Sequence, residues 1–139
     1  MRSLSKVRDH MERKPLTVCP EMEVQTAVLE LLKRRVSRAP VLDADGALIG
    51  ILAESDCLQA FVTEEYFDAP SALVRELMTT EVISVPADLD ILQAAQLFLT
   101  CKLHHLPVVE SDRLVGIISR SDVMRAMVQM HSRPRPQGV

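Results

Sequence analysis

A strand-to-helix junction near the C-terminus carries the polar side chains best placed to bind a small ligand. Residues 116–122 read Gly-Ile-Ile-Ser-Arg-Ser-Asp. A helix N-terminus presents unpaired N–H groups and the positive end of its dipole, so it favours anions. We expect Ser119, Arg120 and Ser121 to hold a phosphate, and the acceptor-only carboxylate of Asp122 to suit two ribose hydroxyls. The alternative is that Ser121 and Asp122 only cap the helix.

An earlier junction has the same frame with different chemistry. Residues 50–56 read Gly-Ile-Leu-Ala-Glu-Ser-Asp, so an alanine replaces the hydroxyl of Ser119 and a glutamate replaces the guanidinium of Arg120. Losing a hydrogen bond to a charged group removes about 1.5–3 kcal/mol, and a carboxylate near a phosphate weakens binding further. We therefore expect the pocket of Asp122 to bind an anionic ligand better than the pocket of Asp56.

The two junctions belong to an internal repeat that spans most of the chain. Residues 7–61 and 74–127 share identical amino acids at matched positions, first 67 and then 66 residues apart. A repeat this long is not a solenoid unit stacked many times. It predicts two similar halves packed about a pseudo-twofold axis, with related clefts that suit a ligand. We place the first repeat at 1–65 and the second at 66–131, followed by a disordered tail over 132–139 that holds two prolines and a glycine.

Each repeat predicts the same order of elements, β-α-β-β-α. A 3.6-residue apolar period over residues 24–32 and 91–99 predicts an amphipathic helix in each half, and Asp90 with Gln93 forms a capping-box pattern. Short apolar runs around a polar turn predict a buried hairpin after each helix. The predicted strands cover residues 16–18, 39–42, 48–52, 83–85, 106–109 and 114–118.

A final helix in each half is expected to begin near Ser55 or Ser121, with a linker over residues 62–73 between the halves. The mixed order of strands and helices predicts an α+β fold, with two small sheets back to back and the helices outside.

Composition narrows the class of protein. A chain of 139 residues suits one compact domain or two small halves that share a core. The net charge of −3 gives no basic field for nucleic acid or anionic lipid. We expect no signal peptide, because no apolar run follows Arg2, Lys6 and Arg8. No stretch approaches the roughly 20 apolar residues of a membrane span, and we expect a cytosolic setting. Cys19, Cys57 and Cys101 have no C-x-x-C spacing, and we expect them to be small buried hydrophobic residues in a reducing compartment.

The motifs, in their order and given twice, resemble a tandem pair of CBS (cystathionine β-synthase) domains, called a Bateman module. Residues 116–122 match that family's G-h-h-[ST]-x-x-D pattern, in which h is apolar. Residues 84–86 resemble its [ST]-V-x-P region, and residues 106–109 resemble its h-P-V-h strand. The resemblance covers residues 7–127, which is almost the whole chain.

The resemblance implies a stand-alone regulatory module that binds AMP, ADP, ATP or S-adenosylmethionine and signals to an effector protein in trans. It implies that adenine enters an apolar cleft beside Thr17 or Ser84, that Asp56 and Asp122 bind ribose, and that Ser119 contacts phosphate. Basic residues just before the h-P-V strand also reach phosphates in that family. The matching positions here are Ser37, Arg38, His104 and His105. For the histidine pair the alternative is an exposed position at a helix end, which the dipole favours.

The last helix carries an apolar stripe made of Met124, Met127 and Val128, continued loosely by Met130. Its helical spacing makes core packing the default interpretation, and the resemblance adds pairing of final helices into a flat homodimer. The rival to a ligand sensor is a structural interaction module whose pockets bind nothing. We expect no enzyme, because no P-loop, H-E-x-x-H or nucleophile elbow is present. A nucleotide hydrolase would have to show turnover.

Overall fold

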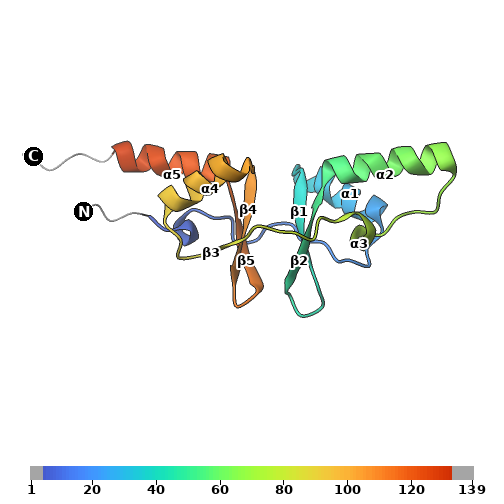
Figure 1. The fold of residues 1–139 in the computed structure, drawn as a ribbon, viewed down its shortest axis with the longest axis horizontal. Coiled ribbons are helices and arrows are strands. Elements are labelled where there is room, and N and C mark those ends of the chain that lie inside the picture. The colour runs from blue at the N-terminus through green and yellow to red at the C-terminus, as the bar shows by residue number, and fades with distance from the viewer. Residues whose placement is uncertain (1–4, 133–139) are drawn as a thin grey trace, which may run out of the picture. The chain divides into compact units, whose positions relative to one another are not determined.

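The structure, a computed structural model, describes residues 5–132, which form two compact units (Figure 1). One unit combines residues 14–83 with residues 111–114. In the other, residues 5–13 join residues 84–110 and 115–132. The segment that opens the first repeat therefore packs with the second repeat. The predicted tail lies outside the described residues except for Ser132, which ends the last helix.

The first unit is an antiparallel hairpin with helices packed on it, and we call it the α1–α2 unit. Its elements are α1 (Val24–Arg34), β1 (Arg38–Leu42), β2 (Leu48–Ala53), α2 (Glu54–Phe67) and α3 (Val74–Leu77). The hairpin pairs Arg38 with Ala53 and Pro40 with Ile51. The strand predicted over residues 16–18 shortens to a single parallel bridge between Val18 and Val41, because the chain turns away at Pro20.

The second unit repeats this plan, and we call it the α4–α5 unit. Its elements are a 3-10 turn (Val7–Asp9), β3 (Val85–Pro86), α4 (Ile91–Cys101), β4 (His105–Glu110), β5 (Arg113–Ser119) and α5 (Arg120–Ser132). The three strands form one sheet in the order β3-β4-β5, and β3 runs parallel to β4. The α+β class predicted from the repeat is confirmed. Among residues 5–132, no helix is long and apolar enough to cross a bilayer.

The linker predicted over residues 62–73 is wrong in its first part, because α2 continues to Phe67. Nothing from Val62 onward breaks a helix until Asp68, which takes a left-handed φ of 49° and ends it. Tyr66 and Phe67 therefore stand on the last turn of α2, where they are 81% and 77% exposed. The consequence is an apolar, solvent-facing end to this helix.

Each unit has its own apolar core, and each core takes a residue from the other repeat. Val7, which is fully buried, belongs to the core of the α4–α5 unit with Ile91 and Leu106. Val74 is also fully buried and packs in the core of the α1–α2 unit. The two short segments 67 residues apart in the repeat are thus exchanged between the units (Figure 1).

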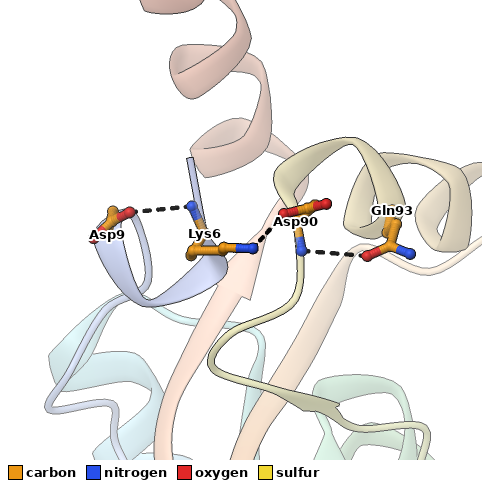
Figure 2. A network of polar contacts seen from close by, with 4 residues as sticks. All are labelled: Lys6, Asp9, Asp90 and Gln93. Carbon is orange, nitrogen blue, oxygen red and sulfur yellow. Dashed lines mark hydrogen bonds and ion pairs between the residues drawn. The ribbon is translucent and has the colours of Figure 1, made fainter. Parts of the chain in front are cut away.

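The N-terminal segment is fixed to α4 by backbone and side-chain contacts. The N–H of Val7 donates to the carbonyl of Leu89 at 2.8 Å. Figure 2 shows Lys6 Nζ paired with Asp90 Oδ1 at 2.7 Å, and the N–H of Asp90 donating to Gln93 Oε1 at 3.4 Å. Asp90 and Gln93 thus meet at the start of α4, as the capping-box pattern predicted. The carboxylate of Asp90 also anchors a segment that precedes it by 84 residues.

The glycine of each strand-to-helix junction accommodates the exchanged segment. A Cβ placed on Gly116 would lie 2.7 Å from the carbonyl oxygen of Glu12 and 2.7 Å from the sulfur of Met11. Glu12 and Ile117 exchange two backbone hydrogen bonds at 2.8 and 3.0 Å, which hold the two segments at this distance. At Gly50 the corresponding contact is with Met78, whose sulfur would be 2.8 Å away. Met11 and Met78 are matched positions of the repeat, and each packs against the glycine of a strand-to-helix junction.

Candidate ligand-binding site

Polar residues from three elements of the α4–α5 unit gather at one end of its sheet. Because β3 runs parallel to β4, Ser84 and His105 lie near the N-terminal ends of neighbouring strands. The N–H of Arg120 donates to the carbonyl of His104 at 3.1 Å, which brings the start of α5 to the same end. Ser84 and His104 are exposed, whereas His105 is half-buried.

Ser119 and Asp122 form a reciprocal cap at the start of α5. The N–H of Asp122 donates to Ser119 Oγ at 3.2 Å, and the N–H of Ser119 donates to Asp122 Oδ2 at 2.9 Å. Ser121 is exposed on the first turn of the helix. The helix is therefore capped, as the alternative interpretation predicted, but the capping residues are Ser119 and Asp122 and not Ser121 and Asp122. Both halves of the Ser-x-x-Asp pattern fix the geometry of the helix N-terminus.

The Asp122 carboxylate has a second partner, which is Arg125 one turn along α5. Arg125 Nη2 lies 2.5 Å from Asp122 Oδ1. The Asp122 side chain is only 18% exposed, whereas that of Arg125 is 68% exposed. A carboxylate has about four lone-pair directions, so Asp122 can still accept hydroxyl donors beside these two contacts. Arg125 was not among the predicted site residues, although an i,i+3 spacing from Asp122 on a helix indicates that the two side chains can form an ion pair.

The guanidinium of Arg120 binds backbone carbonyls near the end of α4. Its guanidinium donates through Nε to the carbonyl of Leu103 and through Nη2 to the carbonyl of Phe98 at 3.1 Å. These carbonyls lie at or just past the C-terminus of α4, where backbone acceptors lack helical partners. Arg120 therefore ties the end of α4 to the start of α5, and contact between its guanidinium and a phosphate stays a prediction.

The α1–α2 unit builds the same junction without the cap. The N–H of Glu54 donates to the carbonyl of Ser37 at 2.9 Å, and Arg38 pairs with Ala53 across the hairpin. Thr17, half-buried, precedes the bridge to β1. Ala53 occupies the N-cap position and supplies no side-chain acceptor. Ser37 and Arg38 thus lie beside the start of α2, whereas Thr17 lies farther along the hairpin, next to the bridge between Val18 and Val41.

Asp56 lines a pocket of about 580 Å³ between α2 and the segment that leads into α3. Within residues 5–132 its carboxylate accepts no hydrogen bond, in contrast to that of Asp122. The neighbouring Cys57 is buried, as expected of the cysteines, whereas Cys101 is only half-buried and Cys19 is exposed. Burial together with the charge of Asp56 raises the pKa of the Cys57 thiol. The thiol of Cys57 therefore stays protonated at neutral pH and is a poor nucleophile. In the described part of the chain, no three His, Cys, Asp or Glu side chains are arranged to hold a metal.

The family profile described as CBS domain matches residues 7–63 and 74–129. The chain belongs to the CBS domain family. MJ1426 of Methanocaldococcus jannaschii is 31% identical, with 88% of this chain and 90% of that relative aligned.

Solved CBS pairs have the same fold. CBSX2 of Arabidopsis thaliana, solved in complex with AMP, gives a TM-score of 0.80 at 29% identity, covering 91% of this chain and 98% of that one. The CBS pair of MJ0100, solved with 5-methylthioadenosine and S-adenosyl-L-methionine, gives a TM-score of 0.76 at 25% identity. That match covers 88% of this chain and 99% of the MJ0100 chain. Similar CBS pairs thus bind adenosine-type ligands.

The unequal caps of the two CBS repeats predict unequal helix stabilities. Ser119→Ala removes the side-chain cap of α5 and is expected to lower the free energy of unfolding by about 1 kcal/mol. Ala53→Ser supplies the missing acceptor at α2 and is expected to raise it by up to about 1 kcal/mol. Urea denaturation measures both changes. Ser121→Ala, at an exposed position, is the control and should change stability by less than about 0.5 kcal/mol. A loss at Ser121 equal to that at Ser119 would contradict the cap.

Proposed function

We propose that this chain is a regulatory module that binds an adenosine-containing ligand at the strand-to-helix junctions of its CBS repeats. The observation that carries the proposal is the set of polar groups at the start of α5, where Ser119 and Asp122 cap the helix beside the segment that leads into β4. The complexes of CBSX2 with AMP and of MJ0100 with S-adenosyl-L-methionine support the ligand class. Ser84 and Thr17 would border the adenine, and the two aspartates would receive the ribose hydroxyls.

The pocket of Asp122 is proposed to bind an anionic nucleotide more tightly than the pocket of Asp56. Ser119 presents a hydroxyl at the helix N-terminus, and Arg120 adds a positive charge near it. At the other junction Ala53 has no hydroxyl and the exposed Glu54 adds a negative charge. A ligand with less negative charge would suit the junction of Asp56 better, because the carboxylate of Glu54 repels a phosphate.

A thermal-shift screen tests both statements. AMP, ADP, ATP and S-adenosylmethionine are added to the purified chain, and a ligand at 100 times its dissociation constant should stabilise the fold by about 2.7 kcal/mol. Asp122→Ala should remove most of the shift given by a phosphorylated ligand, whereas Asp56→Ala should leave most of it. Calorimetry on the same variants checks the stoichiometry. Loss of binding with Asp56→Ala alone would reverse the ranking, and no shift with any ligand would favour the purely structural module.

The output of the module is proposed to pass through a homodimer to an effector protein in trans. Ligand that binds one arrangement better than another shifts its population by the difference in affinity. Met124 and Val128, expected by default to be core, are 60% and 64% exposed, whereas Met127 and Met130 pack against the core. This exposed apolar surface supports self-association. We propose no catalysis, so a phosphate-release assay with ATP should show no turnover.

A further inference from the structure

The two exchanged segments, residues 7–12 and 74–79, are held in their units by equivalent backbone hydrogen bonds. Four such bonds recur between donors and acceptors that are matched positions of the repeat. The donor N–H groups are those of Val7 and Val74 at 2.8 and 2.8 Å, Arg8 and Arg75 at 2.9 and 3.0 Å, Met11 and Met78 at 3.0 and 2.9 Å, and Glu12 and Thr79 at 2.8 and 2.9 Å. A residue of one segment therefore occupies the same place in its unit as its match in the other.

One matched pair within these segments differs in chemistry, and it is His10 and Leu77. Leu77 is half-buried, packs against the core of the α1–α2 unit, and lines the pocket of Asp56. Asp122 is the match of Asp56 in the repeat. The equivalence of the two segments therefore brings His10 and Asp122 to the same side of the α4–α5 unit.

The imidazole of His10 has a hydrogen-bonding atom that the protein does not use. Within residues 5–132, its ring nitrogen Nε2 is buried and has no hydrogen-bond partner. A buried polar atom without a partner destabilises the folded state, and such atoms are rare in folded proteins. A leucine at the same place, as in the other repeat, avoids this cost. The capacity of Nε2 to donate a hydrogen bond thus remains for a group outside the described chain.

The residues around this place are also less acidic in the α4–α5 unit. Three carboxylates line the pocket of Asp56, and no cationic side chain does. At the matched positions of the other unit, Arg125 replaces Gln59 and Met130 replaces Glu64. The α4–α5 unit therefore has one carboxylate fewer and one guanidinium more on this side. Both replacements favour an anionic group there.

We propose that His10 is a ligand-binding residue of the Asp122 junction, and that its Nε2 donates a hydrogen bond to a phosphate oxygen of the nucleotide. This role rests on the proposed function and adds a residue that selects a phosphorylated ligand. The imidazole can turn Nε2 toward the ligand by rotation about its second side-chain torsion, which is a broad one. A hydrogen bond to a charged oxygen is stronger than one between neutral groups, so binding recovers what the unpaired nitrogen costs.

His10→Leu gives the α4–α5 unit the side chain of its match, and it separates stability from binding. In the absence of nucleotide it should raise the midpoint of thermal unfolding by about 3 °C or more, because the unpaired nitrogen is gone. Calorimetry should show at least about tenfold weaker binding of AMP, whereas adenosine, which has no phosphate, should bind within about threefold of the wild type. His10→Gln keeps a nitrogen donor near the place of Nε2 and should retain most of the affinity for AMP.

Two results of these titrations would overturn the role of His10. A higher unfolding midpoint with an unchanged affinity for AMP would show that the imidazole is structural only. Equal losses of affinity for AMP and for adenosine would show that it does not contact the phosphate. Leu77→His is the matched control in the other unit. It should lower the unfolding midpoint and leave tight binding of AMP within about threefold.

Nuclear magnetic resonance of the histidine side chains gives a readout that does not depend on stability. Addition of AMP should shift the Nε2 resonance of His10, and adenosine should shift it much less. His131, exposed on the last turn of α5, is the internal control and should not respond. A His10 resonance that ignores AMP, in a protein that calorimetry shows to be saturated, would overturn the contact.

The wild-type titrations separate failure of this contact from failure of the proposed function. A chain that binds no adenosine-containing ligand would remove the proposed function and the role of His10 together. A chain that binds S-adenosylmethionine but not AMP would remove the phosphate contact alone. Binding of AMP that His10→Leu leaves unaltered would also remove only the role of His10.

Discussion

Val7→Asp is expected to unfold the α4–α5 unit, although Val7 belongs to the first repeat. The side chain is fully buried and packs in a core made of residues from the second repeat. A carboxylate there has no cationic partner in the cluster, and burial of an unpaired charge costs several kcal/mol. The expected loss is more than about 4 kcal/mol, which is comparable with the whole stability of a small domain.

Hydrogen exchange locates the damage from Val7→Asp. Amides of α4, β4 and β5 should lose protection, while those of α1, β1 and β2 keep most of theirs. Val74→Asp is the matched variant, because Val74 is equally buried in the other core, and it should give the reverse pattern. Val7→Ala provides a milder perturbation of the same site. Loss of protection that follows the sequence repeats instead would contradict the exchange of segments.

Gly116→Val is expected to cost at least about 3 kcal/mol, because the new side chain would occupy the space of Met11 and Glu12. The first added carbon already lies 2.7 Å from a backbone oxygen, and overpacking of a tight contact typically costs 1–3 kcal/mol before the second and third carbons are counted. Thermal or urea unfolding measures the loss. Gly50→Val, which meets Met78 and Thr79, should behave in the same way.

A second substitution tests which contact makes Gly116 necessary, the one with Met11 or the one with the backbone of Glu12. Met11→Ala removes the sulfur contact with the new side chain but leaves the carbonyl of Glu12 in place, so it should restore only part of the stability of Gly116→Val. Full recovery would mean that the backbone contact is unimportant. A mild effect of Gly116→Val itself, below about 1 kcal/mol, would show that the exchanged segment is not held at this distance.

Local pattern was sufficient for most elements of the fold. The apolar period over residues 24–32 and 91–99 marks α1 and α4, which extend two residues beyond it at Arg34 and Cys101. The strands of both hairpins are also found, each longer by one or two residues. The length of α2 was missed, because Val62 and Thr63 are weak helix formers and only the absence of a breaker before Asp68 revealed the continuation.

Contacts between segments far apart in the chain could not be predicted from the local sequence pattern. Val7 and Val74 look alike in sequence, and nothing near either residue shows that each packs with the opposite repeat. The role of Arg120 also needed the end of α4 to be in place beside it, since its acceptors lie 17 and 22 residues away. The candidate ligand residues could be named from the motif, but the hydrogen bonds that already occupy Asp122 could not.

The exchange of segments has a consequence for synthesis of the chain on the ribosome. The α1–α2 unit is almost complete once residue 83 has emerged, and it lacks only residues 111–114. Residues 7–12 have to wait for partners that extend from Ala87 to Ile117. Contacts of such wide separation form late and slowly. During that interval Val7 and Met11 have no core to enter, so their segment is expected to be open to chaperones and proteases.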